Sequence, residues 1–354
     1  MGKDLNGKEL GEYLSQKKDG RYLARFTDRF GRRPEYKSYD LKACRKWLKE
    51  HKALDTLNQN VIDESTKFED YFYNQWLEIH KFGIIKENTK ATYITHYRKH
   101  IKEYFGDKPL SSITTIQIKA FFKDEKKAGY KYMTINMSRK IIMDVLERAL
   151  EDHLVMRNEG KGIKLIRDEQ TEPRYLTEDE QRDFMEAAAG SFYYNLYMLM
   201  LGSGLRPGEA YALTEKDIDF ENNVIYVNKT LIYQKWEHMG DTKKTFHLDG
   251  PKTYCSVREV PMSTMAREAL RRQIKQKRVV SSKKHAMVSK RAAPKGFEDL
   301  LFTTIYDTPL ESQIVNDAID RILKEMNYTR EESEVLDDIH PHCFRHTFAT
   351  RCIE

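Results

Sequence analysis

Four side chains in the C-terminal half of the chain are of the types that stabilise and protonate a phosphodiester. Arg206 follows an apolar stretch at a glycine-rich turn, Lys252 precedes a strand-like segment, and His342 lies three residues before Arg345. A guanidinium group binds two phosphate oxygens at once and stabilises the charge of a pentacoordinate transition state. A lysine or a histidine can move a proton to or from a reacting oxygen. The set therefore predicts phosphoryl transfer at a DNA phosphodiester.

The surroundings of these four residues favour the same chemistry without a cofactor. Glu209 lies three residues after Arg206 and is expected to anchor that guanidinium. His342 and Arg345 share a face if they lie on a helix. The sequence shows no carboxylate cluster of the kind that holds two metal ions, so we expect no metal and no cofactor. The alternative for each residue alone is structural: a helix-cap partner, a surface lysine or a His–Arg pair.

The elements that would position these residues form a mixed, mostly helical α/β domain over 175–354. Thr177 opens a capping-box signature, and 191–204 is apolar enough for a buried helix. A helix, a turn and a strand are expected over 209–227. A second strand is expected over 256–263, and it is followed by a helix over 265–278 and a basic loop over 277–296.

The preceding domain, 61–160, shows helical periodicity throughout and is predicted to be an all-α bundle of four helices. A polar, glycine-containing linker is expected over 161–174. Basic and polar side chains on the second and fourth helices are candidates for contacts with DNA phosphates, although a solvated helix face is the alternative for each. These candidates are Lys90, Tyr93, Arg98, Lys99, Thr134, Arg139 and Lys140.

The first domain and its linker, 1–60, contain an arginine-rich hairpin. Alternating apolar residues predict strands over 22–28 and 33–40 around a turn, and a helix-forming stretch follows at 41–51. A small β-sheet with one helix behind it and basic residues on its free face suits a DNA groove. An ordinary solvated hairpin is the alternative. The candidate DNA-binding residues are Arg21, Arg25, Arg32, Arg33 and Lys37.

Composition sets limits on the class of protein. The balance of 61 Lys and Arg against 55 Asp and Glu gives a net charge of +6, which permits a nucleic-acid partner but does not require one. No apolar run is long enough to cross a bilayer, and the N-terminus does not resemble a secretory signal. The 4 cysteines form no CxxC pair, so reduced thiols in a cytoplasmic protein are expected.

Together these motifs resemble one known family. Arg206 within GLRPGEA, Lys252 within PKT, and His342 with Arg345 within HPHCFRHTFAT look like the Arg, Lys and His-x-x-Arg boxes of the tyrosine recombinases, the lambda-integrase-like family. The N-terminal hairpin and helix look like the arm-binding domain of integrases from conjugative transposons and phages. The resemblance therefore covers nearly the whole chain, as a multidomain protein with arm-binding, core-binding and catalytic domains.

The resemblance implies roles for the residues that match the boxes. Arg206 and Arg345 would clamp the scissile phosphate, Lys252 would protonate the leaving 5′-hydroxyl, His342 would assist proton transfer, and Glu209 would buttress Arg206. The implied reaction is site-specific integration and excision of a mobile element through a 3′-phosphotyrosine intermediate. The implied partners are double-stranded DNA at core and arm attachment sites, further copies in a homotetramer on DNA, and possible excisionase and host DNA-bending proteins.

The sequence departs from the family pattern after the His-x-x-Arg box. The family places a second His or Trp and then its nucleophilic tyrosine there, but none of the 21 tyrosines follows Arg345, and the sequence ends at Glu354. The alternatives are a fragment of a longer integrase, a cleavage-dead paralogue that still recognises attachment-site DNA, or a tyrosine supplied by another chain. A type IB topoisomerase shares the four-residue set, but an arm-binding hairpin argues against it.

Overall fold

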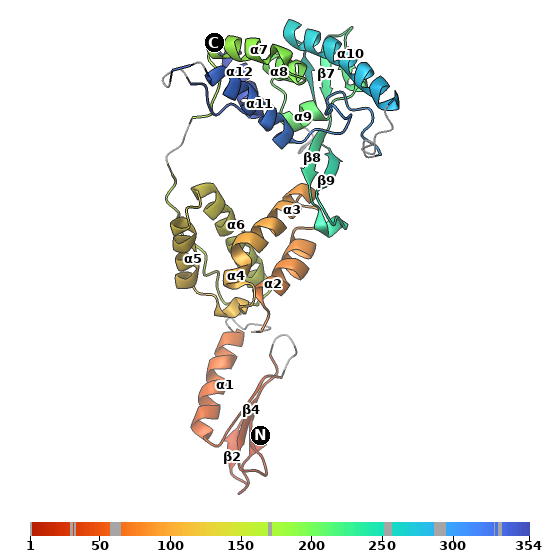
Figure 1. Ribbon diagram of the computed structural model, residues 1–354. Helices are drawn as coiled ribbons and strands as arrows, with labels where there is room; N and C mark the ends of the chain where they lie inside the picture. Colours follow the sequence, from red (N-terminus) through yellow and green to blue (C-terminus); the bar gives the residue numbers. More distant parts are fainter. Residues whose placement is uncertain are drawn as a thin grey trace. The chain divides into compact units, whose positions relative to one another are not determined.

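The computed structural model describes residues 2–28, 31, 33–56, 65–168, 172–250, 257–286, 295–328, 330–331 and 335–354. The chain divides into two compact units, Met1–Asp168 and Glu169–Glu354 (Figure 1). The first unit contains an N-terminal domain, residues 2–56, and a helical domain, residues 65–168. We call residues 172–354 the second unit.

Short antiparallel strands and one helix make up the N-terminal domain. The strands and the helix are β1 (Gly2–Lys3), β2 (Glu9–Gly11), β3 (Leu14–Gln16), β4 (Tyr22–Arg25), β5 (Glu35–Ser38) and α1 (Leu41–Thr56). Strands β3, β4 and β5 form one sheet, and β1 pairs with β2. The predicted hairpin and helix are confirmed as β4, β5 and α1. The first three strands were not predicted, because segments of two or three residues are too short for a period-two signal.

A small core holds the N-terminal domain together. Leu10, Leu14, Ala24 and Cys44 are buried, and Trp47 of α1 packs against them. The ring of Trp47 also stacks on Tyr36 of β5, with 5.8 Å between ring centroids. Strand alternation turns the neighbours of these residues to the other face of the sheet.

The helical domain is the predicted all-α bundle. Its elements are α2 (Phe68–Tyr71), the π-helix η1 (Phe72–His80), α3 (Glu87–His96), the π-helix η2 (Tyr97–Ile101), α4 (Lys102–Phe105), the 3-10 turn η3 (Leu110–Ser112), α5 (Thr115–Lys127) and α6 (Tyr132–Glu151). Helix α5 begins with a capping box, in which the Thr114 side chain accepts from Gln117 N–H and the Gln117 side chain accepts from Thr114 N–H. Helix α3 begins at Glu87, after Lys86, without a side-chain cap.

The predicted linker over 161–174 starts too early. Ile163 is buried among the apolar residues of the bundle, and Leu165 packs against the same cluster. Two apolar side chains in this mostly polar stretch are enough to hold it on the helices. The boundary between the two units therefore falls after Asp168.

The second unit is the predicted mixed, mostly helical α/β domain. Its helices are α7 (Glu178–Ala187), α8 (Tyr194–Ser203), α9 (Pro207–Tyr211), α10 (Thr264–Ala286), α11 (Ser312–Asn327) and α12 (Pro341–Arg351), with 3-10 turns η4 (Ala188–Gly190), η5 (Glu215–Asp217) and η6 (Glu237–Met239). Its strands are β6 (Ile218–Asp219), β7 (Val224–Val227), β8 (Thr230–Gln234), β9 (Thr245–Asp249) and β10 (Arg258–Pro261). The Thr177 capping box and the buried helix α8 are confirmed.

Helix α8 is the centre of the second unit. It is buried from Asn195 to Ser203 and packs against α10 and α12 (Figure 1). An antiparallel sheet in the order β10-β7-β6 and a separate hairpin of β8 and β9 complete the unit. Because α8 is apolar on all sides, it is buried by neighbouring elements on every side. The turn that follows α8 lies next to α12.

The basic loop expected over 277–296 is wrong in its first half. Helix α10 continues to Ala286. Lys277 Nζ lies 2.5 Å from Asp307 Oδ1, and Ser281 Oγ donates to the other oxygen of that carboxylate at 3.3 Å. These contacts tie the extended helix to the turn around Asp307, which the local excess of basic residues did not reveal. Residues 287–294 lie outside the described part of the chain.

Candidate active site

The turn between α8 and α9 positions Arg206. Gly204 ends α8 in the left-handed conformation, with φ 62°, and its N–H donates to Met200 O at 3.0 Å. Arg206 caps α9, and Pro207 occupies its first position, where a missing N–H has no cost. The Arg206 side chain is 54% exposed, so its guanidinium is available to a ligand.

Glu209 holds Arg206 as the sequence predicts. Its carboxylate accepts from the Arg206 backbone N–H at 2.9 Å and from the Arg206 guanidinium at 3.0 Å. The Glu209 side chain is only 10% exposed. A buried carboxylate needs partners of opposite charge. Arg206 gives each oxygen of Glu209 one hydrogen bond, and only one of the two comes from the charged guanidinium.

Arg258 is the partner that sequence reasoning missed. From strand β10 its guanidinium donates to Glu209 Oε1 at 3.0 Å and to Oε2 at 2.8 Å, a two-pronged contact. Burial alone would raise the pKa of Glu209, but the hydrogen bonds from Arg258 and Arg206 hold that pKa below its ordinary value. The missed signal was strand alternation: Arg258 shares a face of β10 with Val260, which packs against the core. A charged residue on an inward face implies a buried partner.

Helix α12 brings the His-x-x-Arg box to the same place. Arg345 Nη1 donates to Gly204 O, the last carbonyl before the Arg206 turn. The pKa of Arg345 is lowered, first by partial burial and then by the positive charge of Arg206. The two arginines expected to act together therefore lie within reach of one another's charge.

His342 lies one turn before Arg345 on α12. Its pKa is lowered by partial burial, then by His340 and His346, and then by Arg345 and Arg206. A lowered pKa favours the neutral ring, in which one nitrogen can accept a proton while the other donates a hydrogen bond. His346 adds to the positive surroundings of this ring.

The cluster of Arg206, Glu209, Arg258 and Arg345 has the charge of an anion-binding site. Three guanidinium groups and one carboxylate sum to two positive charges, and the carboxylate is already engaged by Arg206 and Arg258. A phosphodiester anion, and still more the doubly charged transition state of its cleavage, would match that charge. Lys252 belongs to residues 251–256, which lie outside the described part of the chain.

The described residues form neither a metal-binding cluster nor a membrane-spanning helix. Among the residues that the structure describes, no three His, Cys, Asp or Glu side chains come together in a way that could hold a metal ion. Within the same residues, no helix combines the length and the apolar character needed to cross a bilayer.

The candidate DNA-contacting residues of the helical domain divide into two groups. Tyr93, Arg139 and Lys140 line one pocket together with Lys81 and Lys161, which sequence reasoning did not single out. The other candidates do not line it. Lys90 Nζ lies 2.7 Å from Glu78, Arg98 Nε donates to the Tyr73 hydroxyl at 3.1 Å, Lys99 lies over the Tyr130 ring, and Thr134 is in the first turn of α6.

Among the candidate residues of the hairpin, Arg25 lies in β4, Lys37 lies in β5 and Arg21 directly precedes β4, and all three have acidic neighbours. Arg25 pairs with Glu35 across β4 and β5, and Lys37 Nζ lies 2.5 Å from the same carboxylate. Arg21 is held at 2.5 Å by Asp19. Arg33 is exposed, and Arg32 lies outside the described residues. The positive charge of these side chains is thus partly balanced by Glu35 and Asp19.

Two sequence families match this chain. Residues 174–354 match the family described as "Phage integrase family". Residues 68–125 match the "Phage integrase, N-terminal SAM-like domain". The first match spans the whole arginine cluster, and the second lies in the helical domain.

Similar proteins include mobile-element recombinases. The chain is 27% identical over 369 residues to the "Transposase from transposon Tn916" of Enterococcus faecalis, which covers 98% of this chain and 85% of that protein. It is 26% identical over 360 residues to a "Tyrosine recombinase XerC-like" protein of Caldanaerobacter subterraneus subsp. tengcongensis, covering 95% of this chain and 87% of the relative.

Solved structures show the same architecture. The Tn1549 transposon integrase in complex with circular intermediate DNA superposes with a TM-score of 0.64 at 27% identity, over 78% of this chain and 84% of that one. A lambda integrase dimer bound to a core site superposes with a TM-score of 0.55 at 17% identity, over 97% and 87% of the two chains. At that lower identity the likeness concerns the fold alone.

Proposed function

The chain belongs to the phage integrase family, and from this premise we propose that it integrates and excises a mobile element as a site-specific tyrosine recombinase. One observation carries the proposal most directly. Arg206, Arg258 and Arg345 come from three separate elements and gather around Glu209 and the Gly204 carbonyl. The similarity to transposon and phage recombinases favours recombination over the simple relaxation of DNA by a topoisomerase.

In the proposed reaction the hydroxyl of the family's nucleophilic tyrosine, which this sequence does not contain after Arg345, gives up its proton and attacks the scissile phosphorus. The bond to the 5′-oxygen breaks, that oxygen takes up a proton, and a 3′-phosphotyrosine remains. Arg206 and Arg345 bind the non-bridging oxygens and stabilise the added negative charge. His342 donates a hydrogen bond to the phosphate and assists proton transfer, and Lys252 protonates the leaving 5′-oxygen. Attack by a second 5′-hydroxyl reverses the chemistry and joins the new strand.

The proposed partners follow from the domains. The N-terminal domain binds arm-type sites, the helical domain and the second unit bind core sites, and four copies assemble on DNA. Dimers and tetramers of the lambda integrase on DNA support such an assembly. An excisionase and a host DNA-bending protein would select the direction of recombination, and the reaction would take place in the cytoplasm with the DNA.

The test measures whether the two arginines bind one particular phosphate. The protein first selects its core-site duplex from a random library, and ethylation interference locates the phosphate whose charge contributes most to binding. That phosphate is then replaced by an uncharged methylphosphonate. Wild-type protein should lose roughly tenfold or more in affinity, because hydrogen bonds to a charged group contribute about 1.5–3 kcal/mol each.

Variants give this test its specificity. Arg206→Ala and Arg345→Ala should each bind the natural duplex more weakly and no longer distinguish the methylphosphonate. Arg272→Ala, which removes an exposed arginine of α10, should behave as wild type. If the Arg206 and Arg345 variants still discriminate fully, these arginines do not bind the scissile phosphate and the proposed site is wrong.

A further inference from the structure

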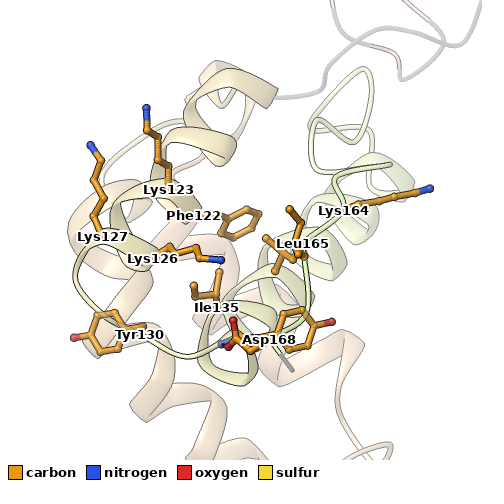
Figure 2. Close-up of a pocket in the computed structure, with 11 residues that line it drawn as sticks. Phe122, Lys123, Lys126, Lys127, Tyr130, Ile135, Lys164, Leu165 and Asp168 are labelled. Carbon is orange, nitrogen blue, oxygen red and sulfur yellow. Dashed lines mark hydrogen bonds between the residues drawn. The ribbon is translucent and has the colours of Figure 1, made fainter. Parts of the chain in front are cut away.

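A lysine-rimmed pocket lies in the helical domain, outside the arginine cluster. It has a volume of about 540 Å³ and is formed by the end of α5, the start of α6 and the segment 164–168 (Figure 2). Phe122 and Ile135 form part of its wall and are buried by the bundle, whereas Ile166 is 85% exposed. Part of the pocket lining is therefore apolar surface in contact with solvent.

Four lysines surround this apolar surface. Figure 2 shows Lys126 reaching into the pocket toward Ile135, while Lys123 and Lys127 extend outward from α5. Lys164 lies on the opposite rim. Lys127 is 3.8 Å from Asp124, but within the described parts of the chain Lys123, Lys126 and Lys164 form no ion pair. The rim thus carries positive charge that is available to a ligand.

The acidic group of the pocket is already engaged. Asp168 Oδ2 accepts a hydrogen bond from the Tyr132 backbone N–H, at the start of α6, at 2.8 Å. This carboxylate satisfies a donor at the helix N-terminus, so an anionic ligand would be attracted to the lysines and not to the end of the helix.

The two tyrosines of the pocket are poor platforms for bases. Lys99 lies over the Tyr130 ring, 5.9 Å from its centroid, and the His100 ring packs on Tyr130 at 4.7 Å. Arg167 lies over the Tyr132 ring at 5.9 Å. Single-stranded nucleic acid binds through open aromatic faces, whereas both tyrosine rings of this pocket already have a cation or another ring against them and Phe122 is buried. Phosphates alone would need the lysines but not the apolar cavity.

We propose that this pocket binds an acidic amphipathic helix of a partner protein. Apolar side chains on one face of that helix would fill the space over Ile135 and Ile166, and carboxylates beside them would pair with Lys123, Lys126 and Lys164. The segment 164–168 is the last described part of the first unit. A bound helix would cover this segment at the point where the chain continues to the second unit and so, on the basis of the proposed function, regulate recombination.

The probe is a pair of fluorescent peptides of about 15 residues with leucine and phenylalanine at helical spacing. One carries glutamate at all other positions, and the other carries lysine there. With the full chain, the glutamate peptide should bind and the lysine peptide should not. Changing Lys123→Glu and Lys126→Glu together should lower the affinity for the glutamate peptide by about tenfold or more and allow the lysine peptide to bind.

Control variants separate the pocket from general charge effects. Lys119→Glu makes the same kind of change on α5 at an exposed position outside the pocket, and it should leave both peptides unaffected. Ile166→Ser keeps the lysines but removes apolar surface, and it should lower the affinity for the glutamate peptide. Equal effects of Lys119→Glu and the double variant would overturn the proposal. So would a parallel loss of affinity for core-site duplex or for a thymidine oligonucleotide in the double variant, because the surface would then bind nucleic acid.

Discussion

Arg258 and Glu209 form a two-pronged ion pair between strand β10 and helix α9, with N–O distances of 3.0 and 2.8 Å. Glu209 simultaneously holds Arg206 at 3.0 Å. The carboxylate is therefore shared between an arginine that is 28% exposed and one that is 54% exposed. Arg258 orients Glu209, and Glu209 orients the more accessible Arg206, so the geometry of the phosphate-binding cluster depends on a residue that need not touch the phosphate.

Replacing Arg258 should therefore affect both stability and phosphate recognition. Arg258→Met leaves the nearly buried Glu209 with Arg206 alone, and a loss of about 1–3 kcal/mol in unfolding free energy is expected in urea titrations. The preference for a charged scissile phosphate should also fall. Arg258→Lys should lie between wild type and Arg258→Met in both measurements, because lysine restores the positive charge but not the second hydrogen bond to the Glu209 carboxylate.

A matched arginine tests this prediction. Arg272 pairs with Glu268 on the surface of α10, where the two side chains are 52% and 51% exposed. Arg272→Met should lower the unfolding free energy by less than about 1 kcal/mol. If Arg258→Met is no more harmful than Arg272→Met, the pair with Glu209 does not support the site.

Gly204 should not tolerate a side chain. Its φ is 62°, and an added Cβ would lie 2.3 Å from Phe348 Cδ1. Gly204→Ala should thus destabilise the protein by roughly 1–3 kcal/mol and displace the carbonyl that accepts from Arg345. Thermal unfolding and core-site affinity measure the two effects. Gly190→Ala is the control, since no heavy atom lies within 4 Å of its added Cβ; equal unfolding temperatures for the two variants would refute the prediction.

The pKa of His342 should report on the arginine cluster. In the free protein the His342 pKa lies below its ordinary value because of partial burial and the nearby positive charges of His340, His346, Arg345 and Arg206. Arg206→Ala removes one of those charges and should raise the pKa, as measured by NMR titration. Binding of core-site DNA should raise it too, because a phosphate anion favours the protonated ring.

The sign of the pH dependence follows from that shift. As pH falls through the His342 pKa, protonation adds a positive charge beside the phosphate, so affinity for core-site DNA should increase. The His342→Gln variant should not show this gain in DNA affinity at lower pH, and the Arg272→Ala variant should still show it. An NMR pKa that is the same in wild type and Arg206→Ala would show that His342 does not face the cluster.

The N-terminal domain should bind its own DNA site. Changing Arg25 and Arg33 to Ala together should abolish protection of the arm site in footprinting while core-site protection persists, because both arginines lie in the N-terminal domain, outside the parts of the chain proposed to bind the core site. Lys49→Ala, an exposed change on α1, should leave both sites protected. If both sites weaken equally in the Arg25 and Arg33 variant, the hairpin is not an independent DNA reader.

Local sequence patterns were sufficient for much of the fold. The capping boxes that start α5 and α7 each span four residues, so the interactions that form them lie within one helical turn. Helix α8 is an uninterrupted apolar run, so its burial follows from its own sequence. The linker and the basic loop were misjudged for the opposite reason. Ile163 and Lys277 are held by distant residues, and composition carries no record of such contacts.

The sequence by itself determined the pair of Arg206 and Glu209, because residues three apart at a helix N-terminus meet whatever the rest of the chain does. It also determined the spacing of His342 and Arg345. Only the tertiary structure decided that Arg258 reaches Glu209 across 49 residues, and that Arg345 reaches Gly204 across 141. Those contacts depend on how α12 packs on α8 and where β10 lies, which is set by the burial of the whole apolar core and not by any local pattern.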